Sequence, residues 1–196
     1  MRQHLLADAV HQRDDVEIHW HAFELDPTLG RAPNLSLPER SQRDLGGTDR
    51  QTRERMEMVE AMAARAGLHY DLSRARPVNS HDAHRLIKFG ESAQLGDAIR
   101  ERLMRAYTSE GAILTDTATL IQLAREVGLD PDSTRTLLAG TDFTDAVHAD
   151  QAAARTLGIG GVPTFVFDNR YAISGARQPE EFRELLERSV RSPISG

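Results

Sequence analysis

The chain has 196 residues, of which 39% are hydrophobic and 28% charged, a composition typical of a globular protein with its own core. Its 24 Lys and Arg residues against 30 Asp and Glu residues give a net charge of −6, which argues against nucleic acid as the main partner. No apolar run approaches the ~18 residues that span a membrane, and the absence of cysteine excludes disulfides, thiolate metal ligands and cysteine nucleophiles within this sequence.

The N-terminal part predicts a strand. The first residues lack the basic stretch and apolar core of a secretory signal, so we expect a cytoplasmic protein without a membrane partner. Residues 16–25 alternate, and the even-numbered positions from Val16 to Ala22 are all apolar. This period of two predicts a strand with one buried face, packed by Trp20 and ended by Pro27.

The middle of the chain predicts a series of helices. Residues 28–50 are rich in proline, glycine, serine and charge, which indicates a loop with at most a short helix near Pro38. From about residue 52 to residue 157, apolar residues recur at helical spacing. Asn79–Ser80, Thr115 or Asp116, and Asp130–Pro131 provide helix starts within it.

The last third returns to strand. Thr164–Phe167 and Tyr171–Ser174 are short β-branched and aromatic runs, separated by a turn at residues 168–170 that is typical of a hairpin. A final helix begins near Pro179. The order of helix, strand, many helices, two strands and helix indicates the α/β class.

A glycine-rich segment at residues 158–165 joins the last middle helix to the hairpin. It is not a phosphate-binding loop, because its spacing differs from the known motifs and it leads from helix into strand. The local sequence alone favours a trans Pro163 that opens a strand. The alternative is a cis Pro163, beside which the N–H and C=O of Val162 stay free to pair with an extended ligand.

Several linked segments carry a family resemblance. Leu157–Phe167 and Arg170–Ala176 resemble the C-terminal half of the DsbA family of thioredoxin-fold oxidoreductases, most closely its FrnE-like branch. Phe23–Pro27, Asn79–Leu86 and Glu101–Tyr107 resemble the same branch in the same order. The resemblance covers nearly the whole chain and favours the cis isomer of the proline.

The resemblance implies a thioredoxin-like fold with a large all-helical insertion. Residues 1–27 and 144–196 would form the thioredoxin-like domain, and residues 28–143 the insertion. The family's first core strand and its Cys-x-x-Cys would lie before Met1, so both are absent from this sequence. We therefore expect either that Met1 is not the natural start and an upstream segment supplies them, or that the chain is a degenerate homologue.

The resemblance also implies a function and a site. The family's chemistry is thiol–disulfide exchange or isomerisation, which this sequence cannot perform without cysteines, so no catalytic residue is assigned. Val162, Pro163 and Thr164 would bind substrate, with Asn79 and His84 lining the groove. The expected partners are thiol- or disulfide-bearing proteins or peptides, or glutathione, with a homodimer left open.

Two other functions stay open at this point. One is a glutathione-dependent enzyme similar to kappa-class transferases or 2-hydroxychromene-2-carboxylate isomerases, and glutathione is then the only cofactor expected. The other is a non-enzymatic peptide-binding or chaperone module.

The remaining polar residues favour structural interpretations. His19 and His21 share one side of the predicted strand, which indicates a solvated face rather than a metal site. Glu24 and Asp26 are interpreted as a solvated strand end rather than an acid–base pair. For His84, helix packing is the alternative to lining the groove.

Overall fold

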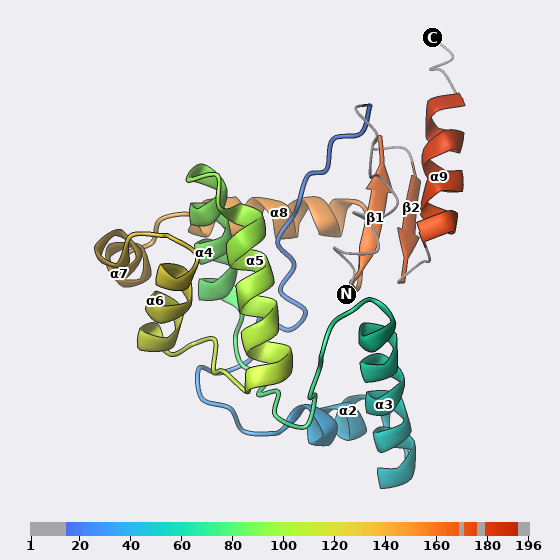
Figure 1. Ribbon diagram of the computed structural model, residues 1–196, viewed down its shortest axis with the longest axis horizontal. Helices are drawn as coiled ribbons and strands as arrows, with labels where there is room; N and C mark the ends of the chain where they lie inside the picture. Colours follow the sequence, from blue (N-terminus) through green and yellow to red (C-terminus); the bar gives the residue numbers. More distant parts are fainter. Residues whose placement is uncertain (1–14, 169–170, 176–178, 192–196) are drawn as a thin grey trace.

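A computed structural model describes residues 15–168, 171–175 and 179–191 (Figure 1). A two-stranded sheet with one covering helix lies at one end of the molecule, and the remaining helices lie beside and below it. The helices are α2 (Leu37–Leu45), α3 (Asp49–Arg65), α4 (His81–Ser92), α5 (Gly96–Arg105) with a π-helical turn η1 (Ala106–Glu110), α6 (Thr117–Glu126), α7 (Pro131–Ala139), α8 (Thr144–Thr156) and α9 (Pro179–Arg191). The strands are β1 (Thr164–Phe167) and β2 (Tyr171–Ser174).

The helix starts follow the capping residues that the sequence predicts. The side chain of Asp116 accepts a hydrogen bond from the third helical N–H of α6, and that of Asp130 does the same for α7, whose first residue is Pro131. At α4 the cap comes from Asn79, whose Oδ1 accepts from the N–H of His81 at 2.9 Å. These bonds satisfy N–H groups that no helical carbonyl can reach.

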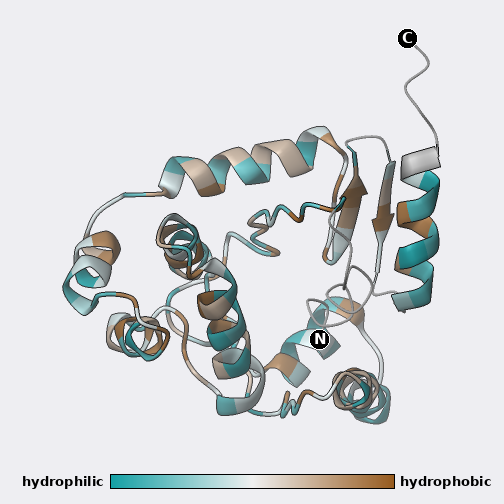
Figure 2. Cartoon of the chain, turned by 45° about the horizontal axis from the view of Figure 1, so that its top comes forward, coloured by the Kyte–Doolittle hydropathy of each residue, from teal (hydrophilic) through white to brown (hydrophobic). Residues whose placement is uncertain are grey.

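The described residues form two hydrophobic cores, and hydropathy colouring shows apolar residues in both strands and interspersed with polar residues along the helices (Figure 2). The larger core lies among α4, α5, α6 and α7 and is centred on Leu86, Ile99 and Leu120. The smaller core lies between the hairpin and α9, where Phe182 meets Phe165 edge-on with ring centroids 4.6 Å apart. Each core joins segments that are far apart in the sequence.

A buried arginine fixes one helical corner. Arg85 on α4 is only 3% exposed. Its guanidinium donates hydrogen bonds of 2.6–2.9 Å to four acceptors, which are the carbonyls of Leu137, Gly140 and Asp142 and the carboxylate of Asp82. These bonds satisfy carbonyls at the end of α7, which have no helical partner, and tie that end to α4.

The strand predicted at residues 16–25 is not formed. The segment is extended and runs between the insert helices and the hairpin, but it is assigned to no sheet. Val16 and Trp20 pack on the smaller core as the alternation predicts, whereas Ile18 is 38% exposed. The prediction was wrong because alternation reports burial of one face, while a strand also needs a neighbouring main chain to pair with.

The hairpin strands are confirmed. β1 and β2 pair antiparallel, with Thr164 opposite Ser174 and Phe167 opposite Tyr171. The predicted turn includes residues 169 and 170, which lie outside the described residues. Among the described helices, none combines the length and the apolar character needed to cross a membrane.

Arg85→Ala should destabilise the chain by about 3 kcal/mol or more, because it leaves several buried carbonyls without a donor. Urea unfolding followed by circular dichroism measures this loss. Arg135→Ala is the matched control: the Arg135 side chain is 60% exposed and, among the described residues, its one ion pair is with Asp132, so its loss should cost no more than about 0.5 kcal/mol. Equal costs for the two variants would contradict the role given to Arg85.

Candidate functional site

The candidate site is the loop at residues 157–163, which joins α8 to β1. The peptide bond between Val162 and Pro163 is cis, the isomer favoured by the family resemblance. The side chain of Thr164 donates a hydrogen bond of 2.8 Å to the carbonyl of Gly161, which closes the loop onto the start of β1. The loop is thus held at the edge of the hairpin.

Val162 presents its side chain and its main chain at the surface of this loop. The side chain is 44% exposed although it is apolar. Within the described part of the chain, neither the N–H nor the C=O of Val162 has a hydrogen-bond partner. An exposed residue with a free donor and a free acceptor can pair with the main chain of an extended ligand.

A cluster of titratable side chains lies where α4 and α8 meet residues 21–24. Glu24 is 7% exposed, and its Oε2 lies 3.3 Å from Nδ1 of His81. The His81 ring in turn lies against that of His148 on α8, with centroids 5.4 Å apart. The interpretation of Glu24 as a solvated strand end was wrong, because α4 and α8 cover this segment in place of a sheet neighbour.

Asp150 on α8 is the second anchor of this segment. Its carboxylate accepts hydrogen bonds of 2.7 Å from the N–H of Ala22 and from His21, and it pairs with Lys88 at 2.9 Å. Burial is the largest influence and raises the pKa of Asp150, but the bonds from Lys88, Ala22 and His21 outweigh it, so the pKa is lowered. His21 bonds to Asp150 while its side chain stays 65% exposed, which agrees with the solvated face that the sequence indicates.

Asp26 is fixed just beyond this segment. The Thr28 hydroxyl and the Arg40 guanidinium each donate to its carboxylate at 2.6 Å. The hydrogen bonds from Thr28 are the largest cause, followed by that from Arg40, and together they lower the pKa of Asp26 to about 2. Such a group stays ionised at neutral pH and cannot serve as an acid.

His84 lies in the first turn of α4 and is half-buried. Desolvation is the main influence and lowers the pKa of its imidazole, which is only partly offset by the nearby Glu24 charge and a hydrogen bond to the Phe23 main chain. A neutral imidazole here holds the 16–25 segment against α4. This arrangement matches the packing interpretation given for His84.

The predicted site residues fall into two groups. Val162, Pro163 and Thr164 lie together at the loop. Asn79 donates from its side chain to the Pro27 carbonyl and accepts from His81, so its polar atoms are used within the fold. Among the described residues, no hydrogen bond or ion pair joins Asn79 or His84 to the loop, and their place in a groove stays a prediction.

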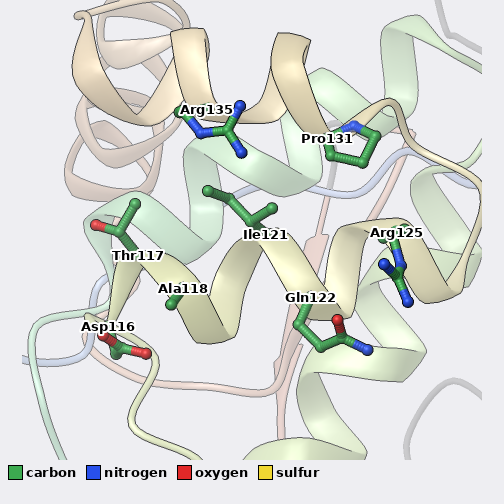
Figure 3. Close-up of a pocket in the computed structure, with 8 residues that line it drawn as sticks. All are labelled: Asp116, Thr117, Ala118, Ile121, Gln122, Arg125, Pro131 and Arg135. Atoms are coloured by element: carbon green, nitrogen blue, oxygen red, sulfur yellow. The ribbon is translucent and has the colours of Figure 1, made fainter.

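A separate hollow of about 650 Å³ lies between α6 and α7, far from the hairpin (Figure 3). It is lined by Asp116, Thr117, Ala118, Ile121, Gln122, Arg125, Pro131 and Arg135. None of the predicted site residues lines it, so it belongs to a different part of the molecule. Within the part of the chain described here, no group of three or more His, Asp or Glu side chains is arranged to hold a metal ion.

Sequence reasoning missed the two anchors of the 16–25 segment. Asp150 meets Ala22 across 128 positions of sequence, and His81 meets Glu24 across 57. No local pattern reports such contacts. Glu24 was the one signal in the sequence for such an anchor, because it is an acidic residue within an alternating segment that was predicted to be buried on one face.

Comparison with known proteins gives one consistent result. The model of the family described as DSBA-like thioredoxin domain matches residues 2–187. The Bacillus subtilis protein YwbO is 26% identical over 175 residues, which are 88% of this chain and 82% of that protein. The crystal structure of a probable DsbA oxidoreductase from Streptomyces coelicolor superposes with a TM-score of 0.92 at 28% identity, covering 99% of this chain and 86% of that one.

A more distant structure shares the fold. The cytosolic disulfide reductase DsbM from Pseudomonas aeruginosa with GSH has a TM-score of 0.64 at 18% identity. The match covers 96% of this chain and 92% of the DsbM chain. At this identity the likeness concerns the fold alone.

His84 should make the stability of the chain depend on pH. Its folded-state pKa lies below its usual value of 6.5, so the unfolded chain binds a proton that the folded chain resists. The free energy of unfolding should therefore fall as pH drops below about 6.5, with a slope of up to about 1.4 kcal/mol per pH unit from this one group.

Urea unfolding at a series of pH values tests this expectation. His84→Gln keeps a hydrogen-bond donor but cannot titrate, so its slope below pH ~6.5 should be smaller than that of the unaltered chain. His19→Gln is the control, because His19 is exposed and, within the described part of the chain, its one charged partner is the exposed Glu17. An unchanged slope in His84→Gln would show that His84 is not the group responsible.

Proposed function

The chain belongs to the DSBA-like thioredoxin domain family, and we propose that it binds thiol- or disulfide-bearing peptides, glutathione among them, through the loop at Val162 and Pro163. The family's members include oxidoreductases, and the chain shares its fold with a probable DsbA oxidoreductase over nearly its whole length. The observation that carries the proposal is the free main chain of Val162 at an exposed turn beside β1.

The main chain of Val162 suits a peptide ligand. Its N–H and C=O offer one donor and one acceptor in the arrangement that a neighbouring extended chain requires. The exposed valine side chain adds apolar contact for the residue beside a ligand sulfur. Glutathione is a short peptide with a thiol, so it is the simplest ligand of this class to test.

The 196 residues supply no sulfur nucleophile. Thiol–disulfide exchange begins with attack by a thiolate on a disulfide sulfur, so the sequence as given can hold such a ligand but cannot exchange with it. We therefore propose recognition without dithiol chemistry for these residues. An assay of insulin reduction by dithiothreitol should show no acceleration by this chain.

The branch of the family and the cellular location are two further proposals. The order of Phe23–Pro27, Asn79–Leu86 and Glu101–Tyr107 supports the FrnE-like branch within the family. The fold shared with a cytosolic disulfide reductase is compatible with the cytoplasmic location expected from the sequence.

Val162→Asp should weaken glutathione binding by about tenfold or more, because it places a carboxylate beside a ligand that carries net negative charge. Isothermal titration calorimetry with reduced and oxidised glutathione measures the dissociation constants. Leu45→Asp is the matched control, since Leu45 is an equally apolar residue, 69% exposed, at the end of α2.

The two variants separate a loop site from non-specific binding. Unchanged affinity in Leu45→Asp together with weaker binding in Val162→Asp supports the loop. Equal weakening of binding in both variants would indicate a general charge effect. The proposed function would be contradicted if the unaltered chain bound neither form of glutathione nor a cystine-containing peptide.

A further inference from the structure

Helix α3 is the longest described helix, and most of its surface faces solvent. Thr52 and Ala63 are its buried residues, and none of its residues belongs to either of the two hydrophobic cores. Its main packing partner is α2, and the two helices lie together below the hairpin, apart from the larger helical core (Figure 1). The outer side of α3 is therefore a surface that neither described core uses.

Four exposed residues form a stripe along this outer side. Glu54, Met58, Ala61 and Arg65 follow one another at spacings of four, three and four residues. Such spacing aligns side chains in one row along a helix and is the spacing with which two helices interlock. The two buried residues stand two positions before the stripe begins and two positions after Ala61, about 200° around the helix from those stripe residues, so the stripe points away from the rest of the chain.

The stripe has an acid near one end, a base at the other and apolar side chains between them. The Met58 side chain is 60% exposed. The Glu54 carboxylate is 56% exposed, and its one ion pair among the described residues, with Arg50, is long at 3.7 Å. In the described part of the chain the Arg65 side chain has no hydrogen bond or ion pair. These groups are available to a partner of matching shape and charge.

The helix macrodipole explains only one of the two charges. It favours bases in the last turn of a helix and acids in the first turn. Arg65 lies in the last turn of α3, whereas Glu54 lies beyond the first turn, which begins at Asp49. The acid at that end of the stripe therefore calls for another partner.

A second copy of α3 in antiparallel orientation matches the stripe. A two-fold axis at the middle of the stripe sets Met58 opposite Ala61 of the second copy, and the same axis sets Glu54 opposite Arg65 of the second copy. Each pair occurs twice, because contacts across a two-fold axis are reciprocal. A long apolar side chain then meets a small one, and each carboxylate meets a guanidinium.

The order of the side chains favours this orientation over the parallel one. In a parallel pair the two copies of Glu54 would oppose each other, as would the two copies of Arg65, and like charges at short range are destabilising. The sequence of acid, apolar, small and base along the stripe is complementary to itself only when one helix is reversed.

We propose that the outer stripe of α3 is the interface of a homodimer in which this helix from two copies packs antiparallel. One pair of helices buries less surface than the ~1,600 Å² of a standard interface, so we expect a weak dimer with a dissociation constant on the order of 100 µM. The stripe contains none of the residues of the loop at Val162, so the dimer does not rest on the proposed thiol-ligand site.

Sedimentation equilibrium of the full chain tests the dimer. The weight-average mass should rise from 21.8 kDa toward twice that value as the concentration increases from about 10 µM to about 1 mM. Glu54→Arg and Arg65→Glu should each weaken association by about tenfold or more, because either change sets like charges opposite each other at two places.

Arg53→Glu is the matched control for the second variant. It makes the same change of charge on the same helix, but Arg53 lies one position before Glu54 and therefore about 100° around the helix from the stripe residue. This variant should associate within about twofold of the unaltered chain. Circular dichroism establishes that each variant is folded.

The two charge-reversed chains also test the pairing itself. One carries an arginine at both ends of the stripe and the other a glutamate at both ends, so an equal mixture of Glu54→Arg and Arg65→Glu should associate at least as well as the unaltered chain. The double variant, which exchanges the two charges, should recover self-association. A chain that stays monomeric at about 1 mM, dimers that both single variants leave intact, or a failure of both the mixture and the double variant to recover association would each overturn the proposal.

Discussion

A strand is stable only where its main-chain N–H and C=O groups meet those of a neighbour, and this requirement governs the sheet end of the molecule. β1 has one neighbour, β2, and its other edge is open among the described residues. Residues 16–25 have the alternation of a strand but no main chain to pair with, so they stay extended without joining the sheet. The same requirement explains why this end of the fold offers main-chain surfaces rather than a closed sheet.

Helices α4 and α8 provide the hydrogen-bond partners that the sheet does not. Asp150, Lys88 and Gln151 supply side-chain partners to the main chain of residues 20–24. Asp150 and Lys88 are charged and largely buried, with side-chain exposures of 12% and 15%, and hydrogen bonds to ionised groups are stronger than neutral ones. The position of residues 16–25 therefore depends on α4 and α8, which lie in the helical part of the chain.

Local features of the sequence were sufficient for the helices but not for the contacts between distant segments. Asp116 and Asp130 start helices through bonds that span three residues, and such bonds can be predicted from spacing alone. Arg85 and Glu24 gave no such signal, because their partners lie more than fifty positions away. The strand at residues 16–25 was predicted from burial alone, and its pairing depends on a neighbour that periodicity does not describe.

The loop at Val162 follows helix α8, which carries the side chains that bind the main chain of residues 22–24. α8 carries Asp150 and Gln151 near its middle, and it continues to Thr156 before the loop begins. The bonds of Asp150 and Gln151 therefore hold residues 22–24 against the same helix that leads into the loop. The segment at residues 22–24 and the loop thus share α8 as a common support, although no described hydrogen bond or ion pair joins them directly.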